Sequence, residues 1–189
     1  MTTFPESLQG CGEILRLCEV IQIPPLLRHF VAKNSFIPGR YNWQKRYFVP
    51  GMKEAVVLAQ EDVKIAKLDQ SFETGFLEKI EAPEKCNPIK SFEILRSLSV
   101  QEIIAACGNG IYPMPLHTVF WLMSQQPNSV EPGHLHSMDQ DNIFLCCNVH
   151  EVPEVVLLRT GIGGWEIRSE PCSQRRSYWG RLFLNFDTK

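Results

Sequence analysis

Residues 142–171, NIFLCCNVHEVPEVVLLRTGIGGWEIRSEP, contain three short runs of β-branched, aromatic and other apolar residues separated by turn-forming residues. A similar run, YWGRLFLNF, follows at 178–186. Short runs of this composition between turn signals indicate strands. The last third of the chain therefore predicts an antiparallel sheet. The glycines of TGIGGW, at 160–165, favour a hairpin turn within it over a phosphate-binding loop, because a strand rather than a helix is expected next.

Apolar residues upstream of this region recur mostly at helical spacing, three and four apart. The expected helices cover 4–21, 26–34, 71–81, 88–98, 100–107 and 116–126. Pro24 and Pro25 separate the first two, which suggests a helical hairpin. Ser99 and Glu102 have the spacing of a capping box. The run at 116–126 is apolar nearly all round, which indicates a buried helix, with a buried strand as the alternative.

Three short strands are expected between these helices, at 40–49, 54–60 and 62–68. Most of the helices nevertheless precede the main group of strands at 142–186, rather than alternating with them, which indicates the α+β class. We therefore expect a helical N-terminal half packed on a mostly antiparallel sheet formed largely by the C-terminal third. The expectation is a single α+β domain over 1–189, helix-rich at 1–127 and strand-rich at 142–186.

The composition is that of a folded globular protein, with 44% apolar and 21% charged residues over 189 positions. A formal charge of −2 gives no general attraction to nucleic acid or to anionic membranes. No apolar run approaches the roughly 20 residues of a transmembrane helix, and the N-terminus lacks a signal-peptide pattern. The seven cysteines include no CxxC pair, so reduced structural thiols and a cytoplasmic location are expected.

The distribution of charge is unusual in the middle of the chain. From Ser97 to Leu158 there is no Lys or Arg in 62 residues, although the span holds six acidic residues and four of the five histidines. These carboxylates are either solvated, paired with the arginines of the following strands (159–181), or engaged with a bound cation. The sequence leaves the three alternatives open.

The densest group of titratable residues lies within this span, in VEPGHLHSMDQDN at 130–142. Two histidines separated by one residue point to the same side of an extended chain, and imidazole and carboxylate groups bind divalent transition metals. The predicted ligands are His134, His136, Asp141 and His150, with Asp139 and His117 as substitutes. Their order loosely resembles that in metal-dependent barrels of the cupin type, with Asp where Glu is usual. The alternative interpretation is a polar loop after a Pro-Gly turn.

Two further segments have features of binding surfaces. The segment CSQRRSYWGRLF places Arg175, Arg176, Tyr178 and Trp179 together, which suggests a partner-binding surface, although an ordinary strand explains the same pattern. The segment SVQEIIAACG resembles the first helix of a helix-turn-helix. The turn after it is too long, and the helix expected next has no Lys or Arg, so DNA recognition is not expected.

Two functional hypotheses follow from these observations. The favoured one is a non-catalytic binding or protein-interaction domain with a protein or small-molecule partner, because no motif specifies a reaction. The alternative is a small metal-dependent enzyme, with His134, His136 and Asp141 as ligands and Glu151 or Asp139 as proton carrier. A covalent mechanism is not indicated, and the sequence does not determine an oligomeric state.

Overall fold

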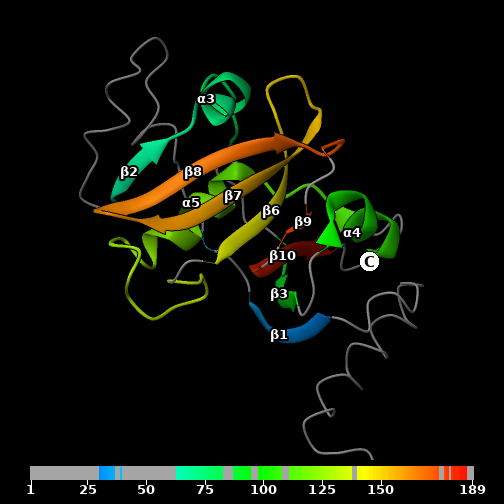
Figure 1. Cartoon of the computed structure of the whole chain (residues 1–189), viewed down its shortest axis with the longest axis horizontal. Helices are drawn as coiled ribbons and strands as arrows, with labels where there is room; N and C mark the ends of the chain where they lie inside the picture. The colour runs from blue at the N-terminus through cyan, green and yellow to red at the C-terminus, as the bar shows by residue number, and fades with distance from the viewer. Residues whose placement is uncertain are drawn as a thin grey trace, which may run out of the picture.

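The structure of the protein is a computed structural model that describes residues 30–36, 39, 63–82, 87–94, 98–107, 111–137, 140–174, 177–178 and 180–186. Its largest element is an eight-stranded sheet with the order β1-β3-β10-β6-β7-β8-β2, and β5 pairs with β10 beside this path (Figure 1). The strands are β1 (Phe30–Phe36), β2 (Ile65–Leu68), β3 (Ile89–Ile94), β5 (Ile111–Tyr112), β6 (Asp141–Cys147), β7 (Pro153–Gly161), β8 (Gly164–Pro171) and β10 (Gly180–Phe186). A second sheet pairs β4 (Leu98–Ser99) with β9 (Ser177–Tyr178).

Strands β6, β7 and β8 are consecutive hairpins within the large sheet. β7 pairs antiparallel with both β6 and β8, which confirms the strands and pairing predicted for 142–171. TGIGGW is the turn between β7 and β8, as predicted, with Gly161 paired to Gly164. A Cβ at Gly164 would lie 2.2 Å from the carbonyl oxygen of Lys64, just before β2. The absence of a side chain at Gly164 therefore lets β2 approach β8.

The prediction of a helical N-terminal half packed on a sheet from the C-terminal third is wrong. Residues 30–34, expected to end a helix, lie in β1, and residues 89–94, also expected to be helical, form β3. Strand β2 confirms the end of the strand expected at 62–68. The sheet is mixed rather than mostly antiparallel, because β10 runs parallel to β6 and β2 runs parallel to β8. The elements expected at 4–29 and 40–60 lie outside the described residues.

The error at β3 has a physical cause. β3 lies between β1 and β10, and its apolar side chains Ile89, Phe92 and Ile94 are all buried. A strand buried on both faces loses the alternation of apolar and polar residues that identifies a half-buried strand. The apolar pattern that is left in the sequence is the three-residue spacing of Ile89 and Phe92, which is also typical of one helical turn. Asn87 and Pro88 add a helix-start signal.

The helices in the described residues are α3 (Gln70–Phe76), α4 (Val100–Cys107) and α5 (Leu116–Ser124). α3 and α5 pack with Phe144, Val156 and Trp165 in one hydrophobic core. α4 lies over the other face of the sheet, where Ile103 lines a small cavity together with Ile143 (Figure 1). Ile143 and Phe144, which are successive residues of β6, therefore point to opposite faces of the sheet, because side chains alternate along a strand.

Two of these helices match their sequence signals. Ser99 Oγ accepts a hydrogen bond from the Glu102 amide at 3.2 Å, and Glu102 Oε2 accepts one from the Ser99 amide at 2.8 Å, which confirms the capping box. α5 confirms the buried helix predicted at 116–126, with Leu116 and Phe120 fully buried. None of the helices in the described part of the chain has the length and apolar character needed to span a membrane.

Candidate functional site

A cavity of about 480 Å³ lies between the segment after α3, the segment leading into α5, and the turn from β6 to β7. Its polar or charged lining residues are Lys79, Glu81, His117, Cys147 and Glu151. Its apolar lining residues are Ala82, Pro113, Met114 and Pro115. We call it the Lys79 cavity. It is open to solvent, and its volume lies in the range of ligand-binding pockets.

Main-chain hydrogen bonds bring the cavity's segments together. The Met114 amide donates to the carbonyl oxygen of Leu145 at 2.6 Å, which ties the segment before α5 to β6. The Val149 amide donates to the carbonyl oxygen of Gly75 at 2.9 Å, which ties the β6–β7 turn to α3. Segments that lie far apart in the sequence therefore meet around one space.

Lys79 links the charged groups of the cavity. Only 8% of its side chain is exposed, and its Nζ lies 3.7 Å from Glu81 Oε1 and 3.4 Å from Glu151 Oε1. Nζ also donates to the carbonyl oxygen of Asn148 at 3.4 Å. A buried ammonium group has lost much of its hydration and needs partners of this kind. Lys79 therefore connects the segment after α3 to the β6–β7 turn.

Glu81 caps the start of α5. The N-cap residue, Pro115, has no side-chain capping hydrogen bond, and the His117 amide donates to Glu81 Oε2 at 3.0 Å. His117 Nδ1 lies 3.4 Å from the same oxygen. Burial raises the pKa of the Glu81 carboxyl, but hydrogen bonds from His117 and the Leu116 amide and the charge of Lys79 outweigh burial and hold the pKa below its usual 4.5. Glu81 is therefore ionised at neutral pH, where it also complements the helix N-terminus.

Glu151 borders the cavity in an unusual backbone conformation. Its φ is 58°, in the left-handed region, and its side chain is 78% exposed. Asn148 builds the turn: its Oδ1 accepts from the His150 and Val152 amides at 2.9 and 3.1 Å. The Asn148 amide donates to the carbonyl oxygen of Val152 at 2.9 Å, which closes a three-residue hairpin loop. Such loops commonly end in a left-handed residue, a position that favours glycine.

The two adjacent cysteines of β6 face different environments. Cys146 is fully buried in the core, whereas Cys147 lines the Lys79 cavity. Burial raises the pKa of the Cys147 thiol, and Glu151 and Glu81 raise it further against the opposing effect of Lys79. The thiol is therefore protonated at neutral pH, which is its weakly nucleophilic form.

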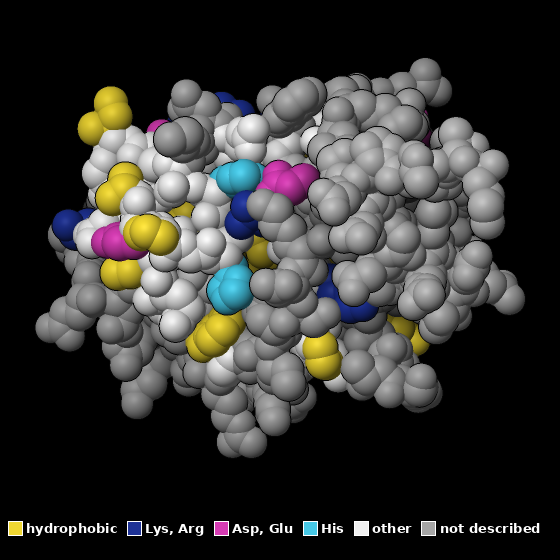
Figure 2. Space-filling model, turned by 90° about the horizontal axis from the view of Figure 1, so that it is seen from below, with side chains coloured by type: hydrophobic (Ala, Val, Ile, Leu, Met, Phe, Trp, Pro, Cys, Tyr) yellow, Lys and Arg dark blue, Asp and Glu magenta, His cyan; other side chains and the backbone are white. Residues whose placement is uncertain are grey.

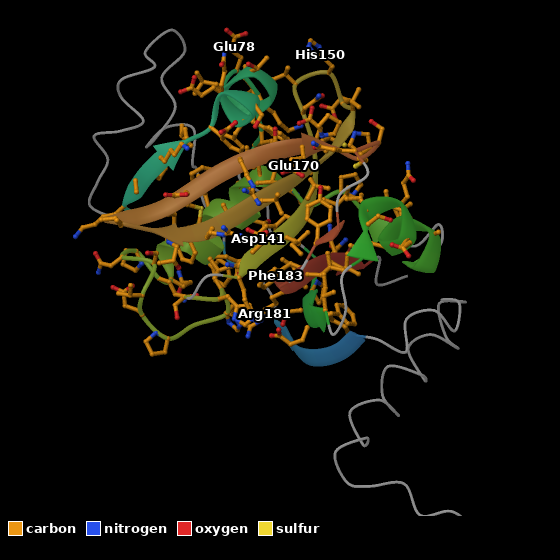
Figure 3. The ribbon with its side chains drawn as sticks, in the orientation of Figure 1. Glu78, Asp141, His150, Glu170, Arg181 and Phe183 are labelled. Atoms are coloured by element: carbon orange, nitrogen blue, oxygen red, sulfur yellow. The ribbon has the colours of Figure 1, made fainter. Side chains whose placement is uncertain are left out.

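The residues predicted as metal ligands lie in separate environments. Asp141 begins β6 and pairs with Arg159 Nε at 3.2 Å and Arg168 Nη2 at 3.3 Å. His150 is in the β6–β7 turn, and Figure 3 shows it well apart from Asp141. Within the described residues, no three His, Cys, Asp or Glu side chains are grouped to hold a metal ion. Asp139, the alternative carboxylate, lies outside those residues, and the metal site stays a sequence prediction.

His134 and His136 lie in the loop before β6 and contact β3 and β10. His136 Nε2 lies 3.0 Å from Glu93 Oε2, and Arg181 Nε donates to Glu93 Oε1 at 2.7 Å. Arg181 Nη1 donates to the carbonyl oxygen of His134. Burial and the charge of Arg181 lower the pKa of His134. Figure 2, which views the molecule from below, shows histidine side chains close to basic and acidic ones on that face.

Two buried amide side chains hold the same loop in place. Gln126 Oε1 accepts from the Leu135 amide at 2.7 Å, and Gln126 Nε2 donates to the carbonyl oxygen of Glu131 at 2.7 Å. Asn142 Oδ1 accepts from the His136 amide at 2.7 Å. This arrangement resembles the alternative interpretation, in which an ordered polar loop leads into a strand.

The surplus of carboxylates at 97–158 is balanced partly from outside the span. Asp141 pairs with Arg159 and Arg168 of the following strands, which is one of the three alternatives that the sequence left open. Glu151 pairs with Lys79, which precedes the span by 18 positions. Each of these two carboxylates therefore has a cationic partner outside the span, although Glu151 shares Lys79 with Glu81.

Of the four residues predicted to form a C-terminal binding surface, Tyr178 is the one that the structure describes. Tyr178 is 1% exposed, and its hydroxyl donates to Glu170 Oε2 at 2.7 Å in the interior. Figure 3 shows Glu170 on the sheet above Asp141. Arg175, Arg176 and Trp179 lie outside the described residues, so the surface as a whole stays a prediction.

Lys79 and Glu81 did not stand out in the sequence. Glu81 is 36 positions from His117, and Lys79 is 72 positions from Glu151. No local spacing marks such pairs, because their contact depends on which segments pack together. The nearest available signal was the lack of cations at 97–158, which required partners elsewhere in the chain.

Comparisons with known proteins give no relative for this chain. No protein-family model matches it, and no curated protein or solved structure matches it significantly. The geometry of the Lys79 cavity is therefore the basis for assigning a function.

Proposed function

We propose that the protein is a non-catalytic interaction domain that binds a segment of a partner protein at the Lys79 cavity. The observation that carries this proposal is a set of exposed apolar residues that adjoin, along the chain, residues lining a charged cavity. Ile80 is 87% exposed, Val152 53% and Tyr112 45%, and each is next in the chain to a lining residue. Large apolar side chains that stay exposed are candidates for contact with another protein.

The chemistry of the lining favours binding over catalysis. Lys79 and Glu81 pair with each other, and Glu81 also caps α5. The Cys147 thiol is held in its protonated form by burial, which raises its pKa. A general acid or base must exchange its proton with a substrate, and a carboxylate committed to a helix end is poorly suited to that role. Glu151 alone combines a place in the lining with a largely exposed carboxylate among the described acidic residues of the cavity.

The test uses a display library of random peptides selected on the purified full chain. The affinity of each selected peptide is then measured for the wild type and for the double variant Ile80→Asp/Val152→Asp. Both positions are exposed, so the variant is expected to fold. We expect binding at least about tenfold weaker, because the two substitutions replace apolar contact area with charge.

Ile162 provides the matched control. It is a fully exposed apolar residue in the turn between β7 and β8, away from the lining of the cavity. Ile162→Asp should leave the affinity unchanged. Peptides that bind the double variant as tightly as the wild type, or a selection that yields no binder, would overturn the proposed function.

A further inference from the structure

We infer that the Lys79 cavity selects a cationic group on its partner, the ammonium of a lysine or the guanidinium of an arginine, and that Glu151 recognises it. This inference rests on the proposed function and specifies its partner. The charges of the cavity, the exposure of Glu151 and the backbone conformation at that residue support it.

The charge of the cavity favours a cation. Among the described lining residues, Lys79 contributes one positive charge and Glu81 and Glu151 contribute two negative charges, so the formal sum is −1 with His117 neutral. The cavity is open to solvent at Glu151, so salt screens this charge in part, but the attraction to a group of opposite charge remains. A partner group of opposite charge is therefore favoured over a neutral or anionic one.

The two carboxylates have different tasks. Glu81 Oε2 accepts from the His117 amide, Oε1 faces Lys79, and the side chain is 15% exposed. Glu151 is 78% exposed, and its contact with Lys79 is 3.4 Å long. The Glu151 carboxylate is exposed on its solvent side, so an incoming cation can share it while Lys79 stays in place. Lys79 would keep Glu81 and the carbonyl oxygen of Asn148 as partners.

The backbone at Glu151 points to a use for its side chain. With φ at 58°, a residue with a Cβ is strained, and glycine would occupy this position more easily. Strain of this kind suggests a role for the residue that causes it. Two roles are open to Glu151: it stabilises the fold through Lys79, or it binds a partner. Substitution by glycine separates them, because it relieves the backbone and removes the carboxylate together.

The apolar lining suits the stem of a basic side chain. Ala82, Pro113 and Met114 line the cavity beside the charged residues. Lysine and arginine place a cation at the end of an aliphatic chain, which packs on apolar surface while the charged group meets a carboxylate. The cavity therefore offers both contacts that such a side chain needs.

The test uses three probes of equal length that differ in charge: n-hexylamine, 1-hexanol and hexanoate. Binding to the full chain is followed through the methyl signal of Met114, which lines the cavity and is 2% exposed. We expect the amine to bind about fivefold more tightly than the alcohol, and the carboxylate to bind most weakly. Equal binding of all three, or no response of Met114, would overturn the inference.

Variants then assign the selectivity to Glu151. Glu151→Gln keeps the backbone strain and removes the charge, and Glu151→Gly removes both. Each should abolish the preference for the amine, and Glu151→Gly should have a thermal midpoint equal to or above that of the wild type. A lower midpoint for Glu151→Gly with the preference retained would show that Glu151 has a structural role, and would overturn the inference.

The peptides selected for the proposed function separate the two proposals. If they bind at the cavity but carry no excess of Lys or Arg, and the amine has no advantage, the inference fails while the proposed function stands. If the Ile80→Asp/Val152→Asp variant binds them as well as the wild type does, the proposed function fails.

Discussion

The loop at 131–137 and the Lys79 cavity contain similar side chains but assemble them in opposite ways. In the first, histidines and acidic residues are close in the sequence, and the structure gives them different partners: Glu93 for His136, and arginines for nearby Asp141. In the second, Lys79 and Glu81 meet residues 36 to 72 positions away. Titratable side chains that are close in the sequence are therefore a poor guide to a site. The packing that brings distant segments together decides which of them meet.

The largest expected effect comes from breaking the arginine cluster at Asp141. Asp141→Ala would leave Arg159 and Arg168 without the carboxylate that both contact, and Asp141 is only 7% exposed. We expect a loss of about 2 kcal/mol in the free energy of unfolding, less than for a fully buried pair because the arginines are partly exposed. Urea denaturation of wild type and variant measures it.

Metal ions provide the control for this prediction. If Asp141 acts through arginine pairing, added Zn²⁺ or Ni²⁺, or a chelator, should shift the urea midpoints of wild type and Asp141→Ala equally. A metal-dependent stabilisation of the wild type that the variant lacks would support the metal site predicted from the sequence, and would contradict the purely structural role of Asp141.

Glu81→Gln should have the next largest effect, because it removes the negative charge that caps α5 and faces Lys79. We expect a loss of about 1 kcal/mol at neutral pH. The pKa of Glu81 is lowered in the folded protein, so the stability contributed by its charge is fully present above the usual 4.5 and is lost as the pH falls through the folded-state value. The difference between wild type and variant should therefore shrink in acid.

Denaturation at a series of pH values from neutral to strongly acidic tests this dependence. Glu78→Gln controls for the removal of a carboxylate, because Glu78 is exposed just after α3 (Figure 3). A difference for Glu81→Gln that stays constant with pH would show that the charge of Glu81 does not stabilise the cavity.

The smallest expected effect concerns the second strained residue among those described, Ser129, near the loop. Its φ is 66°, it is fully buried, and within the described residues its Oγ has no hydrogen-bond partner. Ser129→Gly should raise the free energy of unfolding by about 0.5–1 kcal/mol, because it relieves the backbone and removes a buried hydroxyl. Thermal denaturation measures the gain.

Ser129→Gly also sharpens the comparison with Glu151. Both residues occupy left-handed positions, one beside the loop and one in the cavity. The glycine variant of each should be at least as stable as the wild type, and only Glu151→Gly should change the preference for n-hexylamine. A loss of stability at Ser129 would mean that its side chain makes a contribution which outweighs the strain.

The parts of the fold that could be predicted are those with local signals. Ser99 and Glu102 cap α4 within four residues of each other, and Gly161 and Gly164 close the β7–β8 turn. The helix expected at 88–98 was wrong because residues 89–94 form a strand that is buried on both faces and shows no alternation. The Lys79 cavity could not be predicted, because it forms between the segment after α3, the start of α5 and the β6–β7 turn. These segments are distant in the sequence, and no local signal shows that they pack together.

Local chemistry along the chain was enough to specify the hairpins of β6 to β8 and the capping box of α4, because each depends on neighbours within a few residues. Only the folded chain settled that β3 joins the sheet between β1 and β10, that Asp141 faces two arginines, and that Lys79 reaches Glu151. Those contacts depend on strand order and register, which arise from the packing of the whole sheet rather than from any one segment.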